Sequence, residues 1–150
     1  MISISGIDSG EIDELRISRA VEAVFHRLEV SPEPDVSIVF VDDEEMRELN
    51  KRYRQEDSTT DVLSFALDEL DQESGSSYLG DIVLSLPRVR FQAGEAGHPL
   101  ISEILLLVVH GTLHLLGYDD EEIENRKRMF SLQKEILTEL NVPIARWPEV

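Results

Sequence analysis

Two histidines spaced one helical turn apart are the residues of this sequence best suited to chemistry. The segment from His110 to Asp120 reads HGTLHLLGYDD, so His110 and His114 are four residues apart. In a helix this spacing puts both imidazoles on one face, about 40° apart around the axis. Two histidines placed in this way form the helical half of a zinc site.

A third ligand cannot come from the same helix continued to Asp120. That residue would project about 120° away from His114 and lie about 9 Å further along the axis. The helix therefore has to end and turn back, and Gly117 is placed to do this as a left-handed cap. Asp119 and Asp120 would then turn toward the histidines. Three ligands leave a fourth position open, which is typical of a catalytic zinc site rather than a structural one.

The simpler alternative is that both histidines are polar tips at the edge of a hydrophobic core. Their surroundings, LLLVVHGTLHLLG, are otherwise almost wholly apolar, so both rings should be largely buried and need partners for their nitrogens. A metal ion supplies one partner for each ring, so we favour a metal site. Gly111 stands where zinc proteases carry their glutamate base, which argues against a peptidase. Spacing alone assigns that role to neither Glu103 nor Asp119.

Apolar periodicity predicts helices and strands that are mixed along the chain. The expected strands are residues 2–6, 36–41, 62–67 and 80–86, and the expected helices are residues 12–30, 42–53, 87–94, 100–116 and 121–140. The polar residues 68–78 are expected to form a loop. Because the elements do not alternate strictly, we predict an α+β fold. A small mixed β-sheet would pack with several helices, and the metal site would lie at the end of a buried helix.

Length and composition limit the class of protein. With 150 residues, of which 41% are hydrophobic, the chain is expected to form one domain over residues 1–150. The absence of cysteine removes disulfides, thiolate zinc sites and cysteine nucleophiles. No basic region followed by an apolar run marks the N-terminus, and the apolar block at residues 104–109 is far shorter than the roughly 20 residues of a membrane span. We therefore expect a cytoplasmic protein that does not bind membranes.

The net charge bears on possible partners. There are 14 Lys and Arg against 31 Asp and Glu, which gives a formal charge of −17. A chain this acidic repels nucleic acid as a whole, so RNA binding needs a local basic surface. Three short basic clusters occur, at residues 51–54, 88–90 and 126–128. Composition alone explains each of them better as a solvated face than as a binding surface.

Several segments taken together resemble one known family. Residues 110–120 resemble HGxLHLxGYDH, the signature of the YbeY family of metal-dependent bacterial endoribonucleases, which are also called rRNA maturation factors. Further blocks follow the order of the family: NKRYR at residues 50–54, TDVLSF at 60–65, LGDIV at 79–83 and a closing helix around 129–137. The ordered set spans residues 50–137 and is far more specific than any single block.

The resemblance implies a small α+β domain that holds one zinc ion and cleaves single-stranded RNA. Its implied role is 3′-end maturation of 16S rRNA and ribosome quality control, next to the small ribosomal subunit or its proteins. By position, His110 and His114 are the first two metal ligands, and Asp120 replaces the third histidine of the family. Aspartate is a good zinc ligand, but its charge predicts a weaker Lewis acid. On the family pattern Asp119 lies beside the ligands, or serves as an alternative ligand.

Arg54 occupies the arginine position of the YR block. The resemblance therefore implies a catalytic role in binding a substrate phosphate or stabilising developing charge, for which a planar guanidinium is suited. An ordinary ion pair with Glu56 or Asp57 is the competing interpretation. The remaining polar candidates are expected to be structural or peripheral: Thr60 and Asp61 at the start of a strand, His98 in a surface loop and His26 in an early helix.

Two functions from different classes follow. The first is a metal-dependent endoribonuclease. The alternative is a non-catalytic ribosome-assembly factor with a structural metal, which the charge of −17 favours because an acidic surface suits basic ribosomal proteins. A zinc hydrolase of some other substrate is the third possibility. Salt separates the first two, since RNA binding through phosphates weakens steeply as salt rises.

Overall fold

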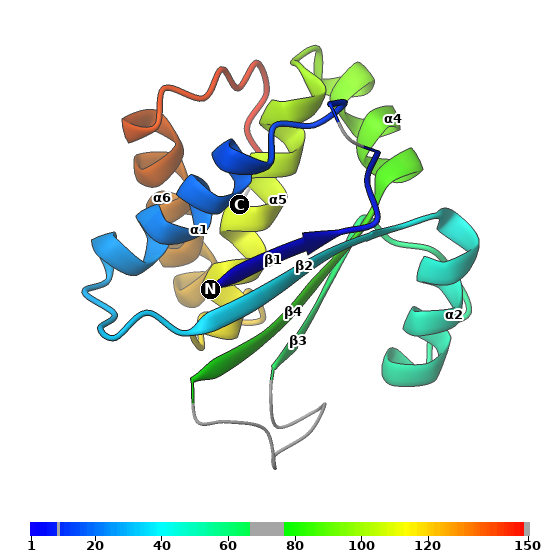
Figure 1. Ribbon diagram of the computed structural model, residues 1–150, viewed down its shortest axis with the longest axis horizontal. Coiled ribbons are helices and arrows are strands. Elements are labelled where there is room, and N and C mark those ends of the chain that lie inside the picture. The colour runs from blue at the N-terminus through cyan, green and yellow to red at the C-terminus, as the bar shows by residue number, and fades with distance from the viewer. Residues whose placement is uncertain (9, 67–76, 149–150) are drawn as a thin grey trace.

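Strands and helices are mixed along the chain, as predicted (Figure 1). The computed structural model describes residues 1–8, 10–66 and 77–148. The strands are β1 (Ile2–Ser5), β2 (Asp35–Val41), β3 (Val62–Ala66) and β4 (Tyr78–Ser85), and the helices are α1 (Glu14–Arg27), α2 (Asp43–Arg54), α4 (Leu86–Ala96), α5 (Leu100–Leu115) and α6 (Ile123–Glu139). The loop expected at residues 68–78 falls mostly outside the described residues, and Tyr78 already belongs to β4.

The four strands form one mixed sheet in the order β1-β2-β4-β3. β1 runs parallel to β2 and β2 runs parallel to β4, whereas β3 pairs antiparallel with β4. This arrangement confirms the predicted α+β fold with a small mixed sheet. It also makes β3 an edge strand, so one side of its backbone is not paired within the sheet.

Helices cover the two faces of the sheet unequally. Figure 1 shows α1, α5 and α6 stacked on one side and α2 on the other. The large core lies beneath the first group, and α5 is central because it contacts α1, α4, α6, β3 and β4. Under α2 lies a smaller cluster of Met46, Leu63, Phe65 and Val83. Every residue from Ser102 to Val109 is buried, so α5 is the buried helix that the sequence predicts.

Side-chain caps explain where the early helices begin. The Asp13 carboxylate accepts hydrogen bonds from the N–H groups of Leu15 and Arg16, so α1 begins at Glu14 rather than at residue 12. Asp42 caps α2 in the same way by accepting from the N–H of Glu45. The chain leaves α1 earlier than expected, because Glu29 has a positive φ of 56°.

Within residues 1–8, 10–66 and 77–148, no single helix has the length and apolar character needed to cross a membrane. Helices α4 and α5 are long and apolar enough only when taken together, and the chain bends by 113° at the break between them.

Candidate metal centre

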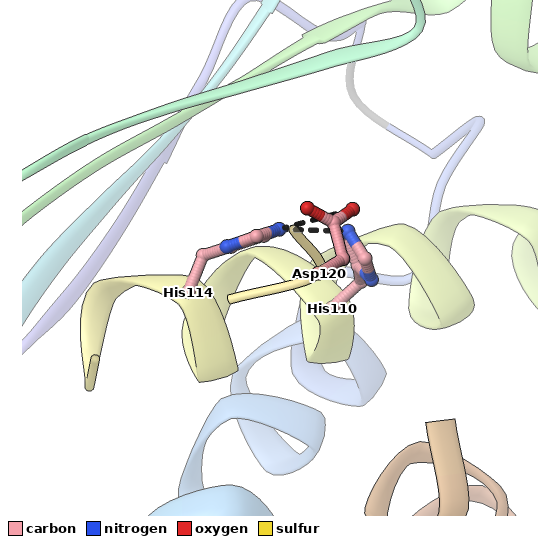
Figure 2. A group of neighbouring side chains, drawn as sticks. All are labelled: His110, His114 and Asp120. Carbon is pink, nitrogen blue, oxygen red and sulfur yellow. Dashed lines mark hydrogen bonds and ion pairs between the residues drawn. The ribbon is translucent and has the colours of Figure 1, made fainter. Parts of the chain in front are cut away.

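His110 and His114 lie on the last turns of α5 and point toward each other. Their Nε2 atoms are 3.1 Å apart, and their rings meet almost edge to face at 80° (Figure 2). The four-residue spacing produces this pairing, as predicted. Two unprotonated nitrogens at this separation repel each other unless a proton or a cation lies between them. The pair is therefore arranged to share a positive charge.

The helix ends at the glycine that the sequence singled out. Gly117 has a φ of +102°, which only glycine adopts readily. Its N–H donates to the carbonyl of His114 at 3.0 Å, and the N–H of Tyr118 donates to the carbonyl of Leu113 at 3.0 Å. These two bonds form the glycine-terminated cap that reverses the chain after a helix. The reversal carries the following residues back toward the histidines.

Asp120 is the carboxylate that this turn brings to the pair. Its Oδ2 atom lies 4.0 Å from Nε2 of His114, and the nearest ligand atoms of the three side chains all lie within 4.8 Å of one another (Figure 2). Donors bound to a tetrahedral zinc ion at 2.0–2.2 Å are separated by about 3.3–3.6 Å. The three side chains are of a type that can hold a metal ion, and the Asp120 carboxylate lies slightly farther from His114 than bound donors would. Arg126 steadies the turn, because its Nε donates to the carbonyl of Asp120 at 3.0 Å.

Gln133 orients the first histidine. It is buried on α6, and its Oε1 lies 2.5 Å from Nδ1 of His110. Nδ1 therefore carries the proton, and the Nε2 lone pair faces the cleft, as a metal ligand requires. Burial is the largest influence on His110 and lowers its pKa, although the hydrogen bond to Gln133 opposes this. These influences favour the neutral ring, which is the form that a metal ion binds.

Asp119 takes a different position from Asp120. Its Oδ1 accepts hydrogen bonds from the N–H of Glu121 at 3.2 Å and from Nδ2 of Asn125 at 3.4 Å. The carboxylate thus helps to order the turn before α6. The candidate metal-binding group found among the described residues consists of His110, His114 and Asp120 and does not include Asp119. A role for Asp119 beside the metal, or as an alternative ligand, stays a prediction.

Arg54 reaches the same cleft from the end of α2. Its guanidinium donates to the carbonyl of Ser64 at 2.8 Å and lies 4.9 Å from the centre of the Phe65 ring. Of the two competing partners, Asp57 accepts instead from Nε of Arg47 at 2.7 Å. Arg54 lines a cleft of about 470 Å³ together with the three candidate ligands. The arginine and the candidate metal site therefore face one shared space beside strand β3.

Gly111 allows α5 to approach the sheet closely at this point. A Cβ atom at Gly111 would lie 3.0 Å from Cγ2 of Ile82 and 3.1 Å from Oγ of Ser64, which is tighter than ordinary contact. The position that carries the glutamate base in zinc proteases therefore faces the sheet and not the cleft. Close packing of α5 on the sheet therefore explains why this position has no side chain that could act as a peptidase base.

Comparison with known proteins agrees with this architecture. The sequence model described as endoribonuclease YbeY matches residues 5–141. The chain is 44% identical over 140 residues to endoribonuclease YbeY of Rhodococcus jostii, covering 89% of this chain and 76% of that protein. It is 42% identical over 133 residues to endoribonuclease YbeY of Oceanobacillus iheyensis, covering 84% and 86%. The chain belongs to the YbeY endoribonuclease family.

A solved structure has the same fold. The solution structure of TM1509 from Thermotoga maritima superimposes with a TM-score of 0.62 at 31% identity, covering 94% of this chain and 92% of that one. The family resemblance expected from motif blocks at residues 50–137 is thus confirmed over most of the chain, including residues before the first block.

The sequence alone did not identify Gln133 and Asp61 as residues of this site, and the expectation for His98 was wrong. Gln133 was noted only as part of a closing helix, and Asp61 was expected merely to shape a strand. The Asp61 carboxylate does accept from the N–H of Val62 at 2.8 Å, but it also lines the cleft. His98 is not in a surface loop: its side chain is 1% exposed, because Glu103 and the N–H of Ala145 occupy its two ring nitrogens.

Proposed function

We propose that this protein is a metal-dependent endoribonuclease that cleaves single-stranded RNA. One zinc ion per chain would be held by His110, His114 and Asp120, and Arg54 would bind the phosphate at the cleavage point. The observation that carries the proposal is that three ligand atoms within 4.8 Å of one another and a guanidinium line the same cleft. The names of the relatives, endoribonuclease YbeY, support the same reaction class.

The donor set favours zinc. Two imidazole nitrogens and one carboxylate oxygen form a usual ligand set for catalytic zinc, which keeps a fourth position for substrate or solvent. When bound, the ion supplies a Lewis acid that polarises a phosphoryl oxygen. The chain's own contribution is to hold the ligands in place, because Gln133 orients His110 and Arg126 steadies the turn that carries Asp120.

Other side chains of the cleft would handle charge and protons. The fork of donors on Arg54 suits two oxygens of one phosphate, and its guanidinium packs over the Phe65 ring at the lining of the cleft. Asp61 is the further carboxylate of the cleft. In this proposal it accepts a proton from the attacking group, whether that group is water or a ribose 2′-hydroxyl.

The setting follows from the family. We propose a role in 3′-end maturation of 16S rRNA and in ribosome quality control, in the cytoplasm, carried out by a single domain over residues 1–150. The formal charge of −17 supports docking on basic proteins of the small ribosomal subunit, which would bring the acidic enzyme to its RNA. Contact with the RNA phosphate would be made in the cleft around Arg54.

The test is cleavage of a single-stranded RNA by the zinc-loaded full chain, with Arg54→Ala as the variant. We expect the rate to fall by about 10² to 10³ while the zinc content stays the same. Arg47→Ala is the matched control, because Arg47 lies on the same helix and pairs with Asp57 away from the cleft. Zinc-bound protein that leaves RNA intact would instead favour a non-catalytic assembly factor with a structural metal.

A further inference from the structure

A second cavity lies directly behind His110. It has a volume of about 310 Å³ and shares Asp61, Val62 and His110 with the metal cleft. Its remaining walls come from α4, α5, α6 and Pro148 near the C-terminus. A cavity of this size falls at the lower end of the range for small organic ligands. It is therefore a second binding space that opens beside the candidate reaction centre.

The polar groups of this cavity are mainly hydrogen-bond acceptors. Oε1 of Gln92 is buried and accepts no hydrogen bond from any residue that the structure describes. Glu103 also lines the cavity, and its Oε1 accepts from Nε2 of His98 at 2.7 Å. An unpartnered buried acceptor is costly unless a ligand satisfies it. The cavity is thus prepared for a ligand that presents N–H donors.

Gln133 adds a hydrogen-bond donor to these acceptors. Gln133 lines the cavity, and because its Oε1 accepts from Nδ1 of His110, its amide nitrogen is the group that can donate to a ligand. The apolar walls are formed by Leu106, Leu107 and Phe130, and the ring centre of Phe130 lies 6.3 Å from that of His110. Aromatic rings and apolar side chains are the surfaces on which unpaired RNA bases stack.

We propose that this cavity binds a guanine base of the RNA, next to the phosphodiester held in the metal cleft. The proposal rests on the endoribonuclease function proposed above. The Watson–Crick edge of guanine offers two adjacent N–H donors, at N1 and N2, and one acceptor, O6. These groups match the acceptors of Glu103 and Gln92 and the donor of Gln133. Cytosine, uracil and adenine each offer a single donor group on that edge, so each would leave an acceptor of the cavity unpaired.

The test uses the four nucleoside 5′-monophosphates, which share ribose and phosphate and differ only in the base. Their affinities for the zinc-loaded full chain are measured by NMR titration, following the side-chain amides of Gln92 and Gln133. We expect guanosine monophosphate to bind about tenfold more tightly than the other three. In Gln92→Met, which keeps the size of the side chain and removes its acceptor, that preference should shrink by about fivefold.

Two further variants keep the test decisive. Glu95 lies exposed on α4, the helix that carries Gln92, so Glu95→Gln should leave the preference for guanine unchanged. Phe130→Leu should weaken all four ligands by a similar factor, because stacking does not depend on the identity of the base. Equal affinities in the wild type, a preference for another base, or an unchanged preference in Gln92→Met would each overturn the proposal.

Cleavage of RNA separates this proposal from the function on which it rests. Oligonucleotides that carry one guanine at successive positions should be cut at a site that moves with the guanine. A guanine preference in binding without any cleavage would count against the endoribonuclease and leave the cavity assignment standing. Cleavage that ignores base identity, together with equal affinities for the four monophosphates, would remove the guanine site and leave the nuclease intact.

Discussion

Helix α5 has a histidine centre near each end, and the two centres differ in how the chain satisfies them. Near its N-terminus, His98 is enclosed: Glu103 Oε1 lies 2.7 Å from Nε2, and Nδ1 accepts the N–H of Ala145 at 3.1 Å. At its C-terminus, His110 and His114 turn their Nε2 atoms toward each other and toward a carboxylate. The His114 side chain is 27% exposed at an open cleft.

The difference indicates what separates a structural histidine from a candidate metal ligand. Burial does not separate them, because His110 is also mostly buried. What separates them is whether the protein supplies a partner for each ring nitrogen. The closed centre uses both nitrogens to join α5 to the C-terminal segment, whereas the open centre leaves lone pairs that only a cation or a proton can satisfy.

Removal of a candidate metal ligand should show the largest difference between the two histidine centres. His114→Ala and Asp120→Ala should lower zinc affinity by more than about 100-fold, because each removes one of only three protein donors. His98→Ala should keep about one zinc per chain. Metal content of the purified proteins by mass spectrometry checks this. Zinc retained by Asp120→Ala but lost from Asp119→Ala would move the third ligand to Asp119.

Gln133→Met tests the support behind the open centre. The variant removes the acceptor for Nδ1–H of His110 and so frees the ring to change tautomer. We expect zinc affinity to fall by about 10- to 100-fold, measured by competition with a chelator. Ser131→Ala, on the exposed side of the same helix, is the control and should bind zinc as the wild type does. An unchanged affinity in Gln133→Met would show that packing alone orients His110.

The open centre could be predicted from sequence largely because its parts are local. Helix geometry aligns His110 with His114, and the glycine cap at Gly117 returns the chain within three residues. Each of these steps depends on neighbours a few residues away. Their placement therefore needs no knowledge of the tertiary fold.

The supporting residues could not be found in this way, because they depend on tertiary packing. Gln133 reaches His110 only after α6 has docked on α5, and Asp61 joins the cleft only because β3 takes the sheet edge beside β4. His98 was misplaced for the same reason. A His-Pro pair after a glycine is typical of an exposed turn, but the segment around Ala145 covers it.

Asp120→His tests the charge at the open centre. Aspartate leaves the metal site one unit less positive than histidine would, so acidic groups at the metal should lose their protons at a higher pH in the wild type. The basic-side rise of the cleavage rate should therefore move down by about one pH unit in Asp120→His. Asp120→Asn removes the charge and keeps nearly the same side-chain size, so it separates the effect of charge from the effect of side-chain length. A rise at the same or a higher pH in Asp120→His would contradict the charge argument.

The closed centre should respond in stability and not in metal binding. His98→Ala leaves the buried Glu103 carboxylate without its partner, so we expect the free energy of unfolding to fall by about 3 kcal/mol. Urea denaturation of the zinc-loaded protein measures this. The double variant with Glu103→Met should lose less than the sum of the two single variants, because the two residues act as one unit. Additive losses would mean that the pair contributes little beyond packing.

Asp81 extends the comparison to a carboxylate outside the candidate metal-binding group of the described residues. It lies on β4, and its Oδ1 is buried without a hydrogen-bond partner among the described residues. Burial raises its pKa above the usual value of 3.8. The folded state therefore binds this proton more tightly than the unfolded chain, and the ionised group costs stability at neutral pH.

Asp81→Asn should accordingly raise the melting temperature at pH 7, by the smallest effect of this series. The advantage of the variant should shrink as the pH falls through the raised pKa and should vanish well below 3.8, where both states of the wild type are protonated. Thermal melts between pH 3 and pH 7 measure it, with Asp57→Asn as the contrasting control, because its pKa is lowered by Arg47. That control should lose stability at pH 7, so melting shifts of the same sign in the two variants would show that the local partners of a carboxylate do not decide the outcome.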